Sequence, residues 1–217
     1  ALIIIDRRKL PRTINPVYCT EAEEVAGAIR EMMVQGAGDI AITAGYGLYL
    51  AARRLEREGR VRDRFSLEKA ASLLKATRPT GFHLAALLEK LMQRVDAAGA
   101  DRAPSEVIRE HLARALDRQQ EISRETGRHG ETLLEDGDTI LTHCFAGAGL
   151  LYMLRFAGEN GKDIKVLCTE TRPYLQGARL TAWSVCKPIL KALTVLMLIP
   201  LVSVMYRTAS GSVKRCS

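Results

Sequence analysis

The sequence predicts an α/β protein with two parts, a helical N-terminal domain and a parallel α/β domain. Amphipathic segments with helix-capping signals occupy most of residues 1–130. Beyond residue 136, two short apolar runs rich in β-branched residues alternate with helical segments. Strands that alternate with helices are typical of a parallel sheet, because a parallel pair needs a long crossover connection. We therefore expect a mostly helical domain over 1–130 and an α/β domain over 136–217.

The N-terminal domain is expected to begin with a strand over residues 1–6, followed by a turn-rich segment up to Pro16. A helix is predicted over residues 21–34. Thr20 is its expected N-cap, and Glu23, three residues on, completes a capping box.

Apolar periodicity predicts four more helices, over residues 39–58, 67–75, 81–97 and 104–127. The first of them is rich in alanine and glycine, so we expect another backbone to approach it closely. The last carries an apolar stripe that indicates core or a partner helix rather than a ligand site, namely Ile108, Leu112, Leu116 and Ile122. Residues 127–137 are the expected linker, because the periodicity changes there from helical to strand-like.

The second domain begins with a predicted strand over 138–144, a glycine-rich turn over 145–149 and a helix over 150–161. A second strand, 162–170, leads towards another helix. A strand that ends in a glycine-rich turn before a helix is a ready anion site, because free N–H groups and the positive end of the helix dipole point at the turn. We expect a truncated Rossmann-like parallel α/β domain.

Cys144 is expected to be the last residue of the first of these strands, where open α/β sheets bind ligands. A thiol beside a helix N-terminus favours the reactive thiolate. Position alone leaves open a buried structural thiol, since cysteine is among the most buried residue types. His143 precedes Cys144, but neighbours along a strand point to opposite faces, so we expect no protease-like Cys-His pair.

The composition favours a globular cytoplasmic protein. No signal peptide is predicted, because the apolar residues 1–5 are too few and charged residues follow them. Five scattered cysteines form neither a disulfide framework nor a metal-binding pattern, and the histidines have no metal-ligand spacing. We therefore expect a reducing compartment and no metal.

Two further partners are not expected from the sequence. All 25 acidic residues precede residue 171, so the excess positive charge of +7 lies in the last 47 residues. The basic residues there are sparse and lack interleaved aromatics. This distribution argues against nucleic-acid binding. The apolar run 189–205 is short and is interrupted by Lys191 and Pro200, so no membrane span is expected. It is interpreted as one or two buried strands, or as a surface that a partner chain covers.

Two motifs carry a family resemblance. The first is Thr142-His143-Cys144-Phe145-Ala146-Gly147, and the second is ETRPYLQGARLTAW, from Glu170 to Trp183. With these motifs, over about residues 1–183, the sequence resembles methylthioribose-1-phosphate isomerase. That enzyme belongs to a wider family with ribose-1,5-bisphosphate isomerase and the alpha, beta and delta subunits of translation initiation factor 2B. The LQGARLTAW portion favours the methylthioribose branch.

The resemblance implies an aldose–ketose isomerase of methionine salvage that converts 5-methylthioribose 1-phosphate to 5-methylthioribulose 1-phosphate without a cofactor. It implies that Cys144 is catalytic and that Gly36, Ala37, Arg78 and Gln176 bind the substrate. Taken without the resemblance, Gly36 fits a helix-to-helix turn, and Arg78 is a cation in a loop. The expected partner is a small sugar phosphate, and the expected assembly is a homodimer.

The chain departs from the family pattern in two places. The phosphate loop of the family carries an arginine and a proline where this chain has Gln35 and Gly38, and Asp39 adds a negative charge nearby. After Trp183 the motif with the second catalytic group of the family, an aspartate, does not occur, which suggests a truncated or frame-shifted reading with weak activity at best. Two alternatives follow: a non-catalytic subunit like those of translation initiation factor 2B, or an isomerase of another sugar phosphate such as ribose 1,5-bisphosphate.

Overall fold

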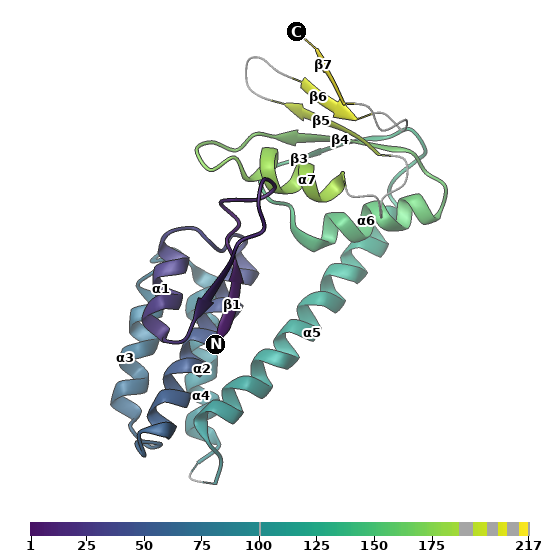
Figure 1. Ribbon diagram of the computed structural model, residues 1–217. Helices are drawn as coiled ribbons and strands as arrows, with labels where there is room; N and C mark the ends of the chain where they lie inside the picture. Colours follow the sequence, from purple (N-terminus) through teal and green to yellow (C-terminus); the bar gives the residue numbers. More distant parts are fainter. Residues whose placement is uncertain (100, 187–192, 199–203, 208–212, 217) are drawn as a thin grey trace. The chain divides into compact units, whose positions relative to one another are not determined.

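A computed structural model describes residues 1–99, 101–186, 193–198, 204–207 and 213–216 (Figure 1). The described chain is a mixed α/β protein that is mostly helical and contains a small parallel sheet. It divides into two compact units, Ala1–Gln119 and Gln120–Ser217, and each is described by itself. The division falls within a long helix.

The first unit combines a two-stranded antiparallel sheet with a helical bundle. Its elements are β1 (Leu2–Ile5), β2 (Pro16–Cys19), α1 (Ala22–Arg30), α2 (Ala37–Arg57), α3 (Arg64–Lys75), α4 (Phe82–Ala97) and the first part of α5 (Pro104–Glu131). The predicted first strand is confirmed. The second strand was not predicted, because Pro16 indicated a turn, although proline is tolerated as the first residue of a strand.

The predicted boundaries of the first helix were wrong. The N-cap of α1 is Glu21, and Glu24 completes the capping box, one residue later than expected. Glu24 accepts hydrogen bonds from the backbone N–H and the hydroxyl of Thr20, at 2.6 and 3.0 Å. The helix ends at Arg30, because Met32 has a left-handed φ of 60° that α-helix geometry excludes.

The small residues of α2 receive neighbouring side chains rather than another backbone. A Cβ on Gly45 would lie 2.5 Å from Leu112, and one on Gly47 would lie 2.9 Å from Leu74. The expectation of a close backbone approach was therefore wrong. The two glycines instead let the side chains of Leu112 and Leu74 pack directly against the backbone of α2.

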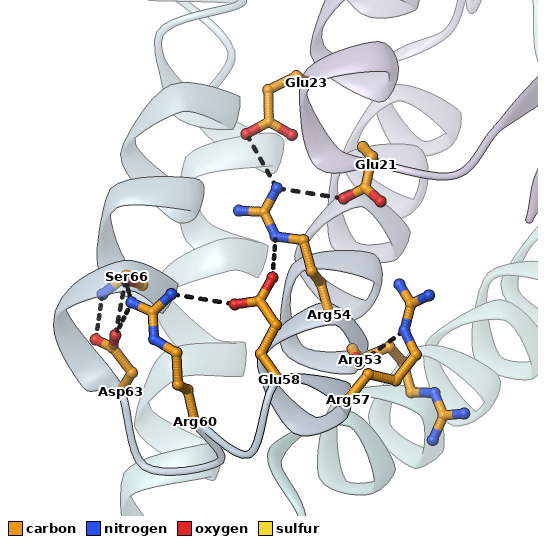
Figure 2. A network of polar contacts seen from close by, with 9 residues as sticks. All are labelled: Glu21, Glu23, Arg53, Arg54, Arg57, Glu58, Arg60, Asp63 and Ser66. Atoms are coloured by element: carbon orange, nitrogen blue, oxygen red, sulfur yellow. Dashed lines mark hydrogen bonds and ion pairs between the residues drawn. The ribbon is translucent and has the colours of Figure 1, made fainter.

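Charged side chains tie together the ends of three helices in the first unit. Arg54, near the end of α2, lies 3.3 Å from Glu21 and 3.8 Å from Glu23, both at the start of α1. It also lies 3.8 Å from Glu58, which in turn contacts Arg60 at 3.1 Å (Figure 2). These carboxylates are each a third or more exposed, so the network lies at the surface.

The predicted apolar stripe of α5 is only half confirmed. Ile108 and Leu112 are fully buried, but Leu116 is 40% exposed and Ile122 is 51% exposed. The helix also continues to Glu131, so the expected linker over 127–137 is helical in its first half.

The glycines in that half of the expected linker serve packing rather than a chain break. A Cβ on Gly127 would lie 2.4 Å from Tyr152, and one on Gly130 would lie 2.7 Å from the sulfur of Met153. Both partners belong to the helix that follows the next strand. Small residues at these two positions therefore allow that helix to approach α5 closely.

The second unit contains a three-stranded parallel sheet in the order β3-β4-β5. Besides the end of α5, its elements are β3 (Thr139–Thr142), α6 (Gly147–Glu159), β4 (Ile164–Thr169), the π-helical turn η1 (Gly177–Thr181), α7 (Ala182–Val185), β5 (Leu193–Leu198), β6 (Val204–Arg207) and β7 (Val213–Cys216). The last two form an antiparallel pair. A core of apolar side chains joins α6, β4 and α7, and includes Leu154, Val166 and Val185.

Strands are confirmed within the apolar run 189–205. β5 pairs in parallel with β4 through the register Ile164↔Leu193 to Thr169↔Leu198, and β6 begins at Val204. The rest of the run, 189–192 and 199–203, lies outside the described residues, so the expected burial is not tested there. None of the described helices is both long enough and apolar enough to cross a bilayer.

Candidate functional site

Cys144 lies two residues beyond the strand that was expected to contain it. β3 ends at Thr142, and Cys144 has a left-handed φ of 60°, which few residues other than glycine adopt. Its side chain is neither fully buried nor fully exposed. The thiol therefore belongs to the loop between β3 and α6 and not to the strand itself.

His143 also lies outside the strand, so the expected alternation of faces does not apply to it. Its Nδ1 atom is 2.8 Å from the hydroxyl oxygen of Thr169, the last residue of β4. This contact joins the loop after β3 to the end of the neighbouring strand. The Nδ1 atom of His143 thus contacts a hydroxyl and not the thiol of Cys144.

Thr181, the last residue of η1, holds the Cys144 loop from the other side. Its hydroxyl donates to the carbonyl oxygen of Cys144 at 2.7 Å and accepts from the backbone N–H of Ala146 at 3.2 Å. Thr181 is 2% exposed, so these bonds are made away from water. The N–H of Ala146, in the turn that was expected to offer free N–H groups to an anion, is therefore already bonded to Thr181.

Gly177 opens η1 where the chain passes the end of β4. A Cβ at this position would lie 1.8 Å from the carbonyl oxygen of Thr169, closer than real Cβ atoms come to any atom. Just before η1, the backbone N–H of Leu175 donates to the carbonyl oxygen of Thr171 at 2.8 Å. Within η1, the backbone N–H of Ala178 donates to the carbonyl oxygen of Glu170 at 3.4 Å. Glycine is therefore required for the loop to fold tightly over the strand end.

Gln176 immediately precedes this glycine and carries a polar atom without an internal partner. Its Oε1 atom is buried and makes no hydrogen bond within the described chain. A buried oxygen without a donor is unfavourable by about 1–3 kcal/mol. A ligand hydroxyl is one group that can satisfy it.

The loops that carry Cys144 and Gln176 therefore meet at the edge of the sheet where the parallel strands have their carboxyl ends. β3 and β4 are neighbouring parallel strands, and both loops follow their carboxyl ends. The bonds of Thr181 and His143 connect them directly. In open α/β sheets, ligands bind at this edge.

A second thiol in the same unit has the opposite environment. Cys168 lies in β4 and has no exposed surface. Burial raises the pKa of its thiol to about 11, so it stays protonated at neutral pH. Cys168 is a core residue, whereas Cys144 is accessible in a loop.

The first unit contains the other residues expected to bind substrate. Gly36 is the N-cap of α2 with a φ of 99°, and Ala37 is the first residue of that helix. Gly36 has no side chain to cap the helix, and the first N–H groups of a helix have no partners within it. This N-terminus therefore offers donors to an anion.

Arg78 lies beside the segment that leads to this N-terminus. One of its terminal nitrogens donates to the carbonyl oxygen of Ile29, at the end of α1, at 3.5 Å. Its Nε atom is buried and has no hydrogen-bond partner among the residues with described positions. Gln35 is also buried, at 2% exposed, and its amide nitrogen donates to the carbonyl oxygen of Met32 at 3.2 Å. Its Oε1 atom accepts no hydrogen bond from the residues that the structure describes.

Arg7 contacts the same loop, and sequence reasoning missed it. Its guanidinium donates to the carbonyl oxygen of Gln35 and lies 2.7 Å from the carboxylate of Asp39. The amide of Gln119 donates to the other oxygen of Asp39 at 3.3 Å. The negative charge that the sequence placed at this loop is therefore compensated. The only sequence signal was a basic residue in the first turn-rich segment.

Within the described ranges, no group of three or more histidine, cysteine, aspartate or glutamate side chains is placed to hold a metal ion.

Comparison with known proteins identifies relatives of this chain. The sequence matches the Initiation factor 2 subunit family over residues 33–207. The methylthioribose-1-phosphate isomerase of Thermosipho africanus is 40% identical over an alignment of 193 residues, and the match covers 86% of this chain and 56% of that protein. The isomerase of Petrotoga mobilis is 39% identical over an alignment of 207 residues, and the match covers 88% of this chain and 58% of that protein. The chain thus spans somewhat more than half the length of the curated relatives it matches.

Solved structures give the same result. The 5-methylthioribose 1-phosphate isomerase of Pyrococcus horikoshii superimposes with a TM-score of 0.72 at 30% identity, covering 91% of this chain and 57% of that one. The translation initiation factor eIF-2B subunit delta from A. fulgidus superimposes with a TM-score of 0.71 at 33% identity, covering 91% of this chain and 60% of that one. By sequence match and by fold, the chain belongs to the Initiation factor 2 subunit family.

Proposed function

We propose that this protein is an aldose–ketose isomerase that converts 5-methylthioribose 1-phosphate to 5-methylthioribulose 1-phosphate. In this proposal Cys144 is catalytic, Gln176 contacts the sugar hydroxyls, and Gly36, Ala37 and Arg78 hold the phosphate. One observation carries it: Cys144 and Gln176 lie in two loops that Thr181 and His143 join at the carboxyl edge of the parallel sheet. Relatives about 40% identical are named methylthioribose-1-phosphate isomerase.

The reaction needs three things from a protein. The phosphate must be held, and the uncapped N-terminus of α2 and the half-buried side chain of Arg78, with its unpartnered Nε atom, suit that task. A proton must reach the ring oxygen so that the sugar ring opens, and hydrogen must then move from C2 to C1. Cys144 can take part in proton transfer because its loop leaves the thiol accessible, unlike that of Cys168.

The first experiment is an isomerase assay with methylthioribose 1-phosphate, on the wild-type chain and on Cys144→Ser. Cys186→Ser, which alters another half-buried cysteine of the same unit, is the matched control. We expect turnover in the wild type and the control, and a loss of about a hundredfold or more in Cys144→Ser. Equal turnover in all three proteins would remove Cys144 from the mechanism.

A binding measurement separates the pocket from the chemistry. Gln176→Leu removes the unpartnered Oε1 atom at nearly constant volume, so folding stability should not fall while affinity for the sugar phosphate does. Isothermal titration calorimetry and thermal unfolding of the same samples provide the two quantities. Unchanged affinity in Gln176→Leu would exclude the assigned contact.

A non-catalytic subunit is the second candidate. It is favoured by the similarity to the eIF-2B delta subunit from A. fulgidus, at 33% identity, and by Gln35 in place of an arginine. Under this alternative the wild-type protein neither converts nor binds methylthioribose 1-phosphate. Saturable binding without turnover would instead indicate a competent pocket that lacks part of its chemistry.

An isomerase of another sugar phosphate is the third candidate. The altered loop at Gln35 and Asp39 is the reason to test it. Assays with ribose 1,5-bisphosphate beside methylthioribose 1-phosphate decide between them. The preferred substrate is the one with the higher kcat/KM.

The finer architecture and the assembly belong to the same proposal. The parallel order β3-β4-β5, with helices in the connections, supports a Rossmann-like arrangement. β3 is an edge strand of its sheet, and Leu141 on it is 64% exposed. Both observations support a homodimer in which a second copy of the chain covers β3. The proposal places this enzyme in the cytoplasm. Light scattering after size exclusion should show a dimer, and Leu141→Lys should weaken it. A monomer at all concentrations would overturn this part.

A further inference from the structure

We propose that Arg7 is a positioning residue for anion binding at the N-terminus of α2, because it fixes the loop before the helix and neutralises Asp39. The inference rests on the proposed function, because it concerns the phosphate of the same substrate. It concerns a residue that the sequence motifs did not single out. All of its contacts lie in the first unit.

The contacts of Arg7 bracket the start of the helix. Its backbone N–H donates to Met33 at 2.9 Å, and its guanidinium donates to the carbonyl oxygen of Gln35. The other terminal nitrogen pairs with Asp39, the third residue of α2, at 2.7 Å. Arg7 thus fixes the backbone just before the N-cap, Gly36, and pairs with a side chain just after it.

Charge explains why this matters for an anion. The N-terminus of a helix carries about half a positive charge, which attracts phosphate. Asp39 in the first turn cancels that attraction unless a cation neutralises it. The side chains of Arg7 and Asp39 are 26% and 35% exposed, so solvent screens the pair only in part.

Gln35 cannot take over this role. Its side chain is buried, uncharged and bonded to its own loop through Met32. The cation that neutralises Asp39 therefore comes from the turn after β1 rather than from the loop itself. Arg7 is the residue that brings it.

The test compares the affinities of the whole chain for methylthioribose 1-phosphate and for inorganic phosphate in a set of variants. Arg7→Gln should weaken both by about tenfold to a hundredfold. Arg12→Gln removes an exposed charge from the same segment and should leave both unchanged. Adding Asp39→Asn to Arg7→Gln removes the uncompensated carboxylate and should restore most of the affinity.

Asp39→Asn alone keeps the test decisive if Arg7→Gln folds poorly. It removes the negative charge beside the helix N-terminus and keeps Arg7, so phosphate affinity should rise. An unchanged or lower affinity in Asp39→Asn, or no recovery in the double variant, would overturn the inference. In a turnover assay Arg7→Gln should raise KM and leave kcat unchanged, which a general loss of folded protein does not do.

Hydrogen exchange separates this inference from the proposed function. Arg7→Gln should speed exchange at the amides of residues 36–40 and not elsewhere in α2, whether or not a sugar phosphate binds. Absence of sugar-phosphate binding in the wild type would refute the proposed function only. Unchanged exchange at these amides would refute the role of Arg7 only.

Discussion

The hydroxyl of Thr181 donates a hydrogen bond of 2.7 Å to the carbonyl oxygen of Cys144, 37 residues earlier in the chain. Because the same hydroxyl accepts from Ala146, one buried side chain satisfies both a carbonyl and an N–H of the loop that carries the candidate catalytic thiol. The left-handed backbone at Cys144 is therefore held by the following loop of the sheet and not by its own strand.

Thr181→Val should destabilise the protein and impair any activity that depends on Cys144. The change keeps the volume of the side chain but leaves a buried carbonyl and N–H without partners, which costs roughly 1–3 kcal/mol. Urea unfolding measures the stability. Thr132→Val is the control, because its hydroxyl bonds His129 at an exposed position, and it should change stability by less than about 0.5 kcal/mol.

Gly177→Ala and Gly27→Ala should have opposite effects on stability. The first places a methyl group 1.8 Å from the Thr169 carbonyl, so the loop or the strand end must shift, at a cost of about 1–3 kcal/mol or more. The second adds a methyl group to α1 where no heavy atom lies within 4 Å. Alanine is the better helix former there, by roughly 0.5–1 kcal/mol. Paired thermal unfolding curves that shift in the same direction would contradict the described packing.

Asp6 should make folding stability depend on pH in the acid range. Its carboxylate is 1% exposed and accepts bonds from the guanidinium of Arg8 at 2.9 Å, which hold the pKa of this carboxyl below its ordinary value. A lowered pKa in the folded state contributes stability above the unfolded pKa of about 4, and this contribution is lost as pH falls through the folded pKa.

Asp6→Asn should therefore lower the free energy of unfolding near neutral pH, by about 1.5–3 kcal/mol, and this difference from the wild type should shrink below about pH 4. Urea titrations across that range measure it. Asp117→Asn, at an exposed position of α5, serves as the control. A difference that stays constant down to the lowest pH would show that the Asp6 carboxylate is not the group responsible.

Arg54→Gln should weaken the surface network of Figure 2 in a salt-dependent way. Arg54 approaches three carboxylates at 3.3–3.8 Å, but all are a third or more exposed, so the expected loss is only about 0.2–1 kcal/mol for each effective pair. Unfolding at low and at molar salt should show the loss disappearing as salt rises. Arg57→Gln is the matched control, because Arg57 donates only to the backbone of Arg53 in this network, and its effect should not depend on salt.

The alternation of strand and helix beyond residue 136 was predictable because it rests on local patterns. The runs that form β3 and β4 are short, apolar and β-branched, and Gly161 follows the helix between them with a φ of 77°. The motifs around Cys144 and Gln176 are contiguous in the chain, so they could be read directly. Errors occurred at element ends, where one residue decides: the N-cap of α1 moved from Thr20 to Glu21.

Glycines were less informative than the strands. Gly127 and Gly130 indicated a linker, yet they lie inside α5 and accommodate Tyr152 and Met153. A glycine that breaks a helix and one that admits a neighbour look the same in a sequence. Only the position of the neighbour distinguishes them.

The sequence by itself determined the mixed α/β class and the family, and it suggested Cys144, Gln176 and Arg78 for the candidate site, because periodicity and contiguous motifs depend on near neighbours in the chain. The tertiary structure decided how those residues are supported. Arg7 bonds a carbonyl 28 residues away, and Thr181 bonds one 37 residues away. Such contacts depend on how the elements of each unit pack against one another, so no local pattern in the sequence indicates them.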